Sequence, residues 1–278
     1  MSGGTTSSQL VVGGVTVVAG GSSGIGRAVV ECFAENGSAV EFFSIDSLAN
    51  DAVATSLVDK GYDVRGTTID AANPHEVRLY FDDVARRRGR LSALVNSAGI
   101  QRYGTAETTS VETWDEVLNV NLRAMFLTTK YAVPLMRVNG GGSIINVSSA
   151  QAVASQKNVV AYTASKGAIV AMTRAMAVDY AVENIRVNSV CPGSVDTPML
   201  RASAAGVDAS DPDRVIAEWG RGHPIGHVGQ PREIADVILF LASSLASFVT
   251  GADLRVDGGA LAGISLVAPS DASDETTS

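Results

Sequence analysis

Residues 10–26 read LVVGGVTVVAGGSSGIG, an apolar, β-branched run that leads directly into a glycine-rich turn. Short continuous apolar runs are typical of strands buried on both faces of a sheet. The following residues, Ile25–Asn36, carry apolar side chains at helical spacing and stop at Gly37. The start of the chain therefore predicts a strand, a tight turn and a helix, which is the repeating unit of a parallel α/β fold.

The same alternation continues along the chain. Five more apolar runs are expected to be strands, at Ala39–Ile45, Val64–Ile69, Leu91–Asn96, Ser143–Val147 and Ile185–Val190. Segments with helical spacing between them include Pro74–Arg88, Val111–Val138 and Val160–Glu183. Repeated strand–helix units predict a doubly wound α/β domain, a parallel sheet with helices on both faces. We expect residues 10–267 to form this domain, with flexible tails at 1–9 and 268–278.

Composition excludes several classes of protein. The chain has 278 residues, of which 46% are hydrophobic, and a formal net charge of −8, which argues against a surface that neutralises nucleic-acid phosphates. No apolar run approaches the roughly 20 residues of a membrane helix, and the N-terminus lacks the pattern of a secretory signal. The two cysteines form no disulfide framework. His75, His223 and His227 have no metal-ligand spacing, so we expect them on the surface or in loops. These features predict a cytoplasmic globular protein without a nucleic-acid, membrane or metal partner.

The glycine-rich turn places Gly20, Gly24 and Gly26 in a G-x-x-x-G-x-G spacing. Glycines let the backbone turn sharply and approach a pyrophosphate, and the N-terminus of the following helix attracts the anion. The turn therefore predicts a dinucleotide site, and a glycine-rich turn without a ligand is the alternative.

Gly20–Gly24 also matches the G-x-S-x-G turn of serine hydrolases, with Ser22 as nucleophile and with Asp196 and His223 following in the order of a triad. We disfavour this alternative because such a turn normally follows several strands, whereas Ser22 follows the first.

Two aspartates follow the next strands. Asp46 lies 20 residues beyond Gly26, the distance at which a carboxylate binds the ribose hydroxyls of a dinucleotide. A carboxylate there repels a 2′-phosphate and so favours NAD. Asp70 follows the third strand, where it could accept a hydrogen bond from the adenine amine. Capping of a helix is the alternative role for each aspartate.

Tyr162 and Lys166 stand four residues apart on an expected helix, so their side chains share a face. A cation held near a phenol favours the phenolate, which could then exchange a proton with an alcohol or ketone. Ser149 ends the preceding strand 13 residues before Tyr162, and its hydroxyl could hold the substrate oxygen. Together with the glycine turn, these residues predict hydride transfer to or from a nicotinamide.

The chain resembles the short-chain dehydrogenase/reductase family over roughly residues 10–262. The matching segments, in the family's order, are Gly20–Gly26, Asn96–Gly99, Asn121, Ser149, Tyr162 with Lys166, Pro192–Gly193 and Val256–Gly259. The resemblance implies a Rossmann-type fold with a seven-stranded sheet of order 3-2-1-4-5-6-7. It also implies an NAD(P)-dependent enzyme that interconverts a secondary alcohol and a ketone.

The family resemblance also implies residue roles. Ser149 would polarise the substrate, Tyr162 would be the acid/base, and Lys166 would bind the nicotinamide ribose and lower the tyrosine pKa. Asn121, the second asparagine of Asn119-Val120-Asn121, would anchor a water that relays protons to Lys166. The expected cofactor-binding set is Gly20, Ser22, Ser23, Gly24, Ile25, Gly26, Asp46, Asp70, Ala71, Asn96, Ala98, Gly99, Tyr162, Lys166, Pro192, Gly193, Val195 and Thr197.

Three positions depart from the family pattern. Ala19 replaces a threonine that opens the glycine turn, and Ser97 replaces the second asparagine of the fourth-strand motif. Neither change removes a catalytic group. Ser44 stands where the family's NAD-selecting aspartate usually lies. NAD is therefore the expected cofactor, with NADP as the alternative.

The substrate end of the site is expected to be polar. Gln101, Gln151 and Gln156 are candidate substrate residues, beside Arg102, Tyr103 and Asn158, and they favour a polyol or sugar over a steroid. The alternative is that they are polar residues at a solvated loop edge. The equivalent of residues 199–227 is a mobile lid in the family, and the family implies a homotetramer. The alternatives to a dehydrogenase are a dinucleotide-sensing regulatory protein without catalysis and the hydrolase that uses Ser22.

Overall fold

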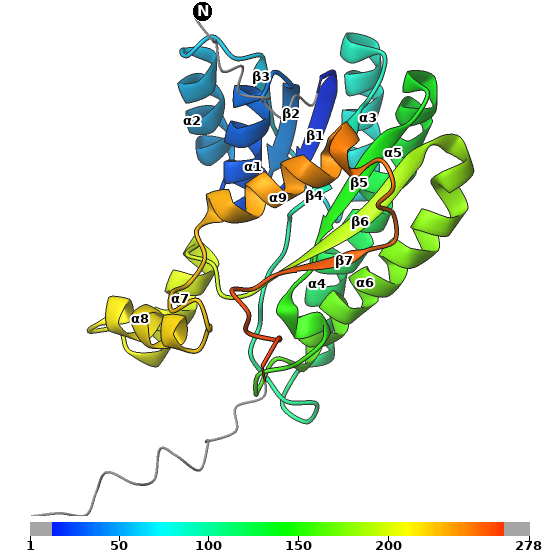
Figure 1. Cartoon of the computed structure of the whole chain (residues 1–278). Coiled ribbons are helices and arrows are strands. Elements are labelled where there is room, and N and C mark those ends of the chain that lie inside the picture. Colours follow the sequence, from blue (N-terminus) through cyan, green and yellow to red (C-terminus); the bar gives the residue numbers. More distant parts are fainter. Residues whose placement is uncertain (1–12, 264–278) are drawn as a thin grey trace, which may run out of the picture.

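The computed structural model describes residues 13–263. The predicted tails, 1–9 and 268–278, lie outside the described residues, as do both ends of the predicted domain. Seven parallel strands form one sheet in the order β3-β2-β1-β4-β5-β6-β7, which confirms the predicted order (Figure 1). The strands are β1 Val15–Ala19, β2 Ala39–Ser44, β3 Val64–Thr68, β4 Ala93–Asn96, β5 Gly142–Val147, β6 Ile185–Pro192 and β7 Asp253–Val256.

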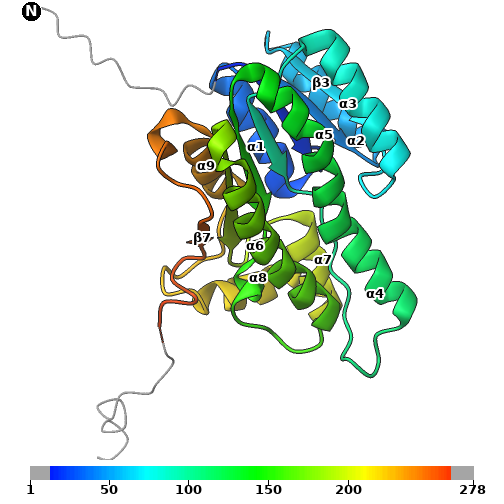
Figure 2. The ribbon, with the colours of Figure 1, turned by 90° about the vertical axis from the view of Figure 1, so that its right-hand side faces the viewer.

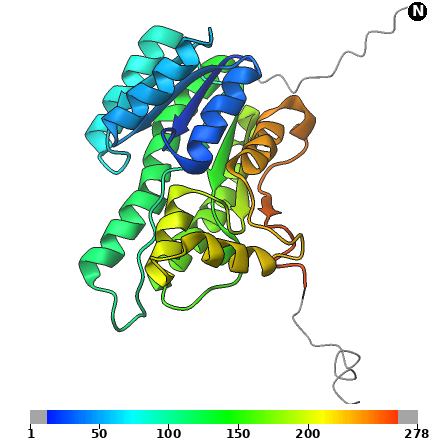
Figure 3. The ribbon, with the colours of Figure 1, turned by 90° about the vertical axis from the view of Figure 1, so that its left-hand side faces the viewer.

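Helices cover both faces of the sheet, as Figures 2 and 3 show from opposite sides. They are α1 Gly24–Glu35, α2 Ser47–Val58, α3 Pro74–Arg88, α4 Val111–Leu118, α5 Ala124–Asn139, α6 Val160–Tyr180, α7 Pro198–Val207, α8 Pro212–Arg221 and α9 Pro231–Ala242. Short helical turns are η1 Asn119–Arg123, η2 Ala150–Ala152, η3 Ala181–Glu183 and η4 Ser244–Ala246. No helix within residues 13–263 has the length and apolar character needed to cross a bilayer.

Each face of the sheet has its own hydrophobic core. On one face, Phe33 of α1 and Ile238 of α9 pack with Phe42 of β2. On the other, Phe81 of α3 and Met136 of α5 pack with strand residues. The central strands are thus buried on both sides, which explains why their sequences are nearly continuous apolar runs rather than alternating ones.

The expected long helix Val111–Val138 is interrupted in the structure. Residues Asn119–Arg123 form a single π-helical turn between α4 and α5. Such turns insert one extra residue into a helix and are frequent at functional sites. The expected lid, residues 199–227, contains most of α7 and α8, which lie away from the helices that flank the sheet (Figure 1).

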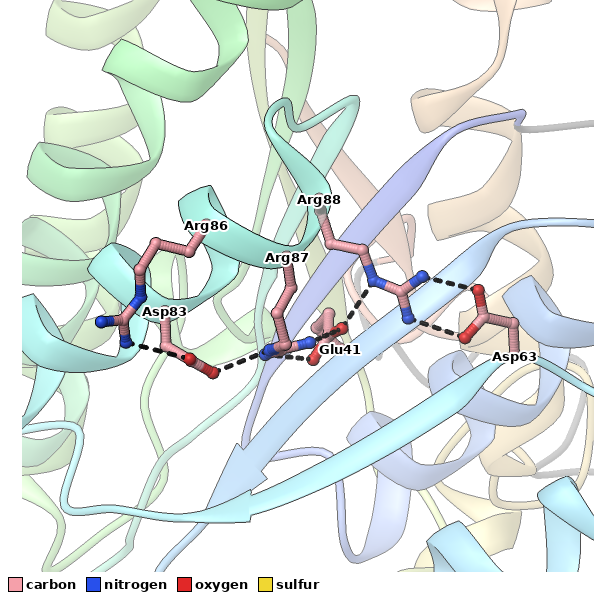
Figure 4. A network of polar contacts seen from close by, with 6 residues as sticks. All are labelled: Glu41, Asp63, Asp83, Arg86, Arg87 and Arg88. Atoms are coloured by element: carbon pink, nitrogen blue, oxygen red, sulfur yellow. Dashed lines mark hydrogen bonds and ion pairs between the residues drawn. The ribbon is translucent and has the colours of Figure 1, made fainter.

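A charge network around the buried Glu41 ties α3 to the neighbouring strands (Figure 4). Glu41 of β2 is fully buried and accepts hydrogen bonds from Arg87 and Arg88 at the end of α3. Arg88 also binds both carboxylate oxygens of Asp63 at 2.7 Å, and this contact lowers the pKa of Asp63. Arg87 binds Asp83 at 2.8 Å. The network therefore compensates a carboxylate in the interior with two cations.

Candidate active site

A cavity of about 1370 Å³ runs along the carboxyl ends of the strands. The strand order reverses between β1 and β4, and α/β folds bind ligands at this point. Of the predicted residues, those lining the cavity are Gly20, Ser22, Ser23, Gly24, Ile25, Asp46, Asp70, Ala71, Ala98, Gly99, Gln101, Ser149, Gln151, Gln156, Tyr162, Lys166, Pro192, Gly193, Val195 and Thr197. Gly26, Asn96 and Asn121 do not line it.

The glycine turn allows a very close approach of backbone segments. Gly20 has a positive φ of 79°, and a Cβ atom there would lie 2.7 Å from the Cα atom of Ala98. A Cβ atom at Gly26 would lie 2.0 Å from the carbonyl oxygen of Gly20, so Gly26 lets α1 start directly against the turn. Ser23 at the N-cap makes no side-chain capping bond to α1. The first N–H groups of α1 are therefore free of that cap, beside a cavity large enough for a dinucleotide, and the turn fits a pyrophosphate.

The end of β2 forms a small polar cluster beside this turn. The hydroxyl of Ser22 donates to that of Ser44 at 2.9 Å, and Ser44 donates to the side chain of Asn50 at 2.8 Å. Asp46 accepts a hydrogen bond from the backbone N–H of Ala49 and so caps α2, the alternative role considered for it. Asp46 also lines the cavity, and its carboxylate is exposed. Capping α2 therefore does not prevent this carboxylate from also facing a bound ligand.

Asp70 also lies at the cavity wall and is exposed. Its side chain accepts a hydrogen bond from the N–H of Ala72 at 2.8 Å, so it stabilises its own turn. Ala71 beside it is buried in the core under α3.

Tyr162 and Lys166 meet at the cavity, one turn apart on α6. Tyr162 is 8% exposed and Lys166 is 4% exposed. The Nζ atom of Lys166 lies 5.4 Å from the centre of the Tyr162 ring and donates to the carbonyl oxygen of Val147 at 2.9 Å. The sequence therefore predicted correctly that both side chains share one face of a helix.

Ser148 and Ser149 directly follow β5, and their hydroxyls make different hydrogen bonds. Ser148 donates its hydroxyl to the carbonyl oxygen of Lys166 at 2.9 Å, which joins the strand to α6. The Ser149 hydroxyl oxygen accepts the local N–H of Gln151 at 3.1 Å, and this hydroxyl is close enough to Tyr162 to affect the Tyr162 pKa. The Ser148 hydroxyl is bound to the helix backbone, so Ser149 stays the predicted substrate residue of the two.

Burial dominates the electrostatics of this site. It raises the pKa of Tyr162, while the neighbouring Ser149 hydroxyl lowers that pKa. Burial also lowers the pKa of Lys166 to about 8, because the charged ammonium is removed from water. The Tyr162 pKa is thus raised, not lowered as expected: desolvation outweighs the hydrogen bond to Ser149, and Lys166 is not among the groups that shift this pKa.

Asn121 lies behind the cavity wall, in the π-helical turn. Its side chain accepts from the N–H of Ile100 at 2.7 Å and donates to the carbonyl oxygen of Ile100 at 2.9 Å and to Ser165 at 3.0 Å. A Cβ atom at Gly99 would lie 3.4 Å from Asn121 and 3.6 Å from the Lys166 Nζ atom. Asn121 therefore holds the loop after β4 close to Lys166.

Asn96 is also an interior residue. It donates to Asn146 of β5 at 2.9 Å and accepts from Thr128 of α5 at 2.7 Å. These bonds align β4 with its neighbours, and the following residues Ala98 and Gly99 then reach the cavity.

The structure argues against the hydrolase alternative. Ser22 donates to Ser44, Asp196 pairs with Arg201 at 2.7 Å, and the Nδ1 atom of His223 bonds to the carbonyl oxygen of Asp257 at 2.7 Å. Each member of the supposed triad thus has a different partner, whereas a triad needs its three side chains hydrogen-bonded in sequence.

The substrate end of the cavity is formed by the loops after β4 and β5 together with α7 and α8. Gln101, Gln151 and Gln156 line it, as do Arg102 and Tyr103. Asn158 does not; its carbonyl oxygen instead accepts the N–H of Gly104 at 2.7 Å. Arg102 is paired with Glu116 at 2.6 Å.

Sequence reasoning missed several wall residues from the lid, including Met199, Leu200, Trp219 and His223. His223 lies in a loop, as expected, but it is buried rather than on the surface. The sequence indicated only that residues 199–227 form a lid. No local pattern distinguishes these side chains from the other side chains of the lid. Among residues 13–263, no group of three or more His, Cys, Asp or Glu side chains is placed to hold a metal ion.

Comparison with known proteins agrees with this geometry. Residues 19–260 match the family model described as enoyl-(acyl carrier protein) reductase. The chain is 39% identical over 246 residues to cis-4-hydroxycyclohexanecarboxylate dehydrogenase of Sinomonas cyclohexanicum, covering 88% of this chain and 95% of that protein. It is 36% identical over 249 residues to L-fucose dehydrogenase of Bos taurus, covering 89% of each. The ligand-free structure of Thermoplasma acidophilum aldohexose dehydrogenase superposes with a TM-score of 0.86 and 38% identity, covering 94% of this chain and 98% of that one.

The fold and the site define an oxidoreductase with a dinucleotide cleft and a Tyr–Lys pair at one end of it. The chain belongs to the short-chain dehydrogenase/reductase family. It is an NAD(P)-dependent enzyme that acts on CH–OH groups and interconverts a secondary alcohol and a ketone.

Proposed function

We propose that this chain oxidises a hydroxylated secondary alcohol, a polyol or sugar, with NAD as the hydride acceptor and Tyr162 as the acid/base. The observation that carries the proposal is the convergence of Tyr162, Lys166 and Ser149 on one cavity. A protein that only sensed a dinucleotide would not need a phenol and an amine buried together beside its ligand. This is the reason to prefer an enzyme to the regulatory alternative.

In alcohol oxidation, Ser149 holds the substrate oxygen and Tyr162 accepts the hydroxyl proton. Lys166 lies against the Tyr162 ring and stabilises negative charge on the phenol when it is itself protonated. A bound nicotinamide supplies the hydride acceptor, or the donor in the reverse direction. Asn121 positions the Gly99–Ile100 backbone beside Lys166 and so keeps the amine at the cavity wall.

The end of β2 favours NAD over NADP. The exposed carboxylate of Asp46 lies at the cavity wall, where it would accept hydrogen bonds from ribose hydroxyls and repel a 2′-phosphate. No Arg or Lys belongs to the lining contributed by residues 20–25, 43–49 or 69–71. NADP remains the alternative because Ser44, not an acid, ends the strand.

A hydroxylated substrate fits the wall at the far end of the cavity. Three glutamine side chains, Gln101, Gln151 and Gln156, can each donate and accept hydrogen bonds. Trp219 and Tyr103 add aromatic surface to the same cavity. A cavity that offers both polar amides and aromatic rings suits a sugar or cyclic polyol, whose ring has both hydroxyls and an apolar face. The likeness to an aldohexose dehydrogenase and an L-fucose dehydrogenase supports this class.

We also propose a homotetramer in the cytoplasm. Exposed apolar side chains include Phe126 on α5 and Val178 on α6, and Leu245, Phe248 and Leu254 around η4 and β7. These two regions are candidates for the two kinds of interface that a tetramer requires. Both cysteines are free thiols, which suits a reducing compartment. Size-exclusion chromatography with light scattering measures the assembly.

A fluorescence titration of the purified protein with NADH and with NADPH, followed by a screen of alcohols, tests the proposal. We expect NADH to bind at least about tenfold more tightly than NADPH, and sugars or cyclic polyols to be oxidised faster than hydrophobic alcohols. Activity confined to hydrophobic secondary alcohols would contradict the substrate class. Tighter binding of NADPH would contradict the role of Asp46.

A further inference from the structure

His223 lies at the end of the lid, after α8, and is only 7% exposed, yet it belongs to the wall of the cavity. Its Nδ1 atom lies 2.7 Å from the carbonyl oxygen of Asp257. A carbonyl oxygen can only accept, so Nδ1 must carry the hydrogen. The Nε2 atom of the neutral ring is then a hydrogen-bond acceptor.

His223 is fixed from three sides. Its own backbone N–H donates to Gly220 at the end of α8, at 3.0 Å. On the other side, the carboxylate of Asp257 accepts the N–H groups of Gly259 and Leu261 at 3.0 Å, which fixes the turn that presents the Asp257 carbonyl. Gly193 closes the third side, because a Cβ atom there would lie 2.6 Å from the Cε1 atom of His223.

The Nε2 atom makes no hydrogen bond to any residue from 13 to 263, and it is not among the enclosed polar atoms that lack a partner. The Nε2 atom is therefore not fully enclosed by protein atoms, and His223 lines both the large cavity and a smaller one of about 280 Å³. A buried acceptor with a fixed tautomer and an open lone pair is suited to one kind of ligand group, a hydrogen-bond donor.

We propose that His223 is a specificity-determining residue whose Nε2 atom accepts a hydrogen bond from a second hydroxyl of the substrate, one that does not react. This inference rests on the proposed function, since the reacting hydroxyl is assigned to Tyr162 and Ser149. A substrate with a single hydroxyl leaves the acceptor on His223 without a partner, and polyols are favoured over simple alcohols.

The test compares trans-cyclohexane-1,2-diol with cyclohexanol, which differ by one neighbouring hydroxyl. His223→Asn keeps an N–H that reaches the Asp257 carbonyl but removes the Nε2 acceptor. We expect this variant to lose about tenfold of the preference for the diol in kcat/KM, through a higher KM for the diol alone. His223→Gln, whose longer amide reaches the Nε2 position, should retain part of the preference. His227→Asn is the matched control, because His227 is exposed in the same segment and does not line the cavity.

The same contact can be measured without turnover, by calorimetric titration of the diol into the enzyme–NADH complex. Weaker diol binding in His223→Asn, with unchanged NADH affinity, supports the proposal. A wild-type enzyme that does not prefer the diol, or a variant that loses affinity for both alcohols or for NADH equally, overturns it. Oxidation of either alcohol by the wild-type enzyme tests the dehydrogenase activity separately, because that readout does not depend on the preference that His223 would set between the two.

Discussion

Tyr162 and Lys166 respond in opposite directions to the same cause. Both side chains are buried at the cavity, and burial disfavours whichever form carries charge. The phenol therefore holds its proton more tightly and the amine less tightly than in water. Burial thus favours the neutral form of each group, the phenol of Tyr162 and the free amine of Lys166.

The rate of ketone reduction should fall as the pH rises past about 8, where Lys166 loses its proton and the cation beside the phenol disappears. Alcohol oxidation should rise with pH instead, since it needs Tyr162 without its proton and the pKa of Tyr162 is raised. Measuring kcat/KM for ketone reduction and for alcohol oxidation at pH values below and above 8 checks the prediction. Reduction that accelerates with increasing pH would be incompatible with it.

The proximity of the candidate catalytic side chains Tyr162 and Lys166 could be predicted from the sequence because their spacing is local. Tyr162 and Lys166 are one helical turn apart, and the helix alone brings them together. His223 could not be found this way, because its burial depends on contacts with Gly193 and with Asp257, which are 30 and 34 residues away. The role of Asn121 was also only partly foreseen, since its side chain bonds to Ile100 in a distant loop.

At the level of elements, apolar runs predicted six strands to within a few residues. The seventh, Asp253–Val256, could not be found in the same way because it is an edge strand whose first three residues are exposed. It therefore lacks the continuous apolar run of the central strands. The π-helical turn was also missed, since its apolar side chains continue the helical pattern of the segments around it.

Gly26→Ala tests the junction between the glycine turn and α1. The new Cβ atom would lie 2.0 Å from a backbone oxygen, so the helix has to shift away from the turn. We expect a loss of about 1–3 kcal/mol in the free energy of unfolding and weaker NADH binding. Urea unfolding and a fluorescence titration measure the two effects.

Gly206→Ala is the control for this prediction. Gly206 lies inside α7 and a Cβ atom there has no neighbour within 4 Å, so alanine should leave stability unchanged or raise it by up to about 1 kcal/mol. If the two variants had the same free energy of unfolding and the same NADH affinity, Gly26 would not be needed where α1 meets the glycine turn.

At the scale of the whole molecule, the candidate active site and the charge network around Glu41 lie in different parts of the fold. The cavity lies along the carboxyl ends of the strands, whereas the Glu41 network joins the end of α3 to β2 (Figure 4). None of Glu41, Arg87 and Arg88 lines the cavity. Stability should therefore be separable from catalysis by mutation.

Glu41→Gln should lower the free energy of unfolding by about 3 kcal/mol, because it leaves Arg87 and Arg88 without their shared buried anion. The loss lies at the low end for a buried pair, since the arginines keep Asp83 and Asp63 as partners. Urea unfolding checks this, with Arg27→Ala in an exposed pair as the control that changes little. The kcat of folded Glu41→Gln should equal that of the wild type, and a large drop in kcat would contradict the separation.

Replacement of Tyr162 by Phe measures the central claim most directly, because it removes one hydroxyl from the cavity wall and nothing else. The account predicts that the variant binds NADH within about threefold of the wild-type affinity while its alcohol oxidation falls by about 10²–10⁴-fold, the range of a positioned acid/base. Turnover that stays within tenfold of wild type, with nucleotide binding intact, would show that Tyr162 is not the group that moves the proton.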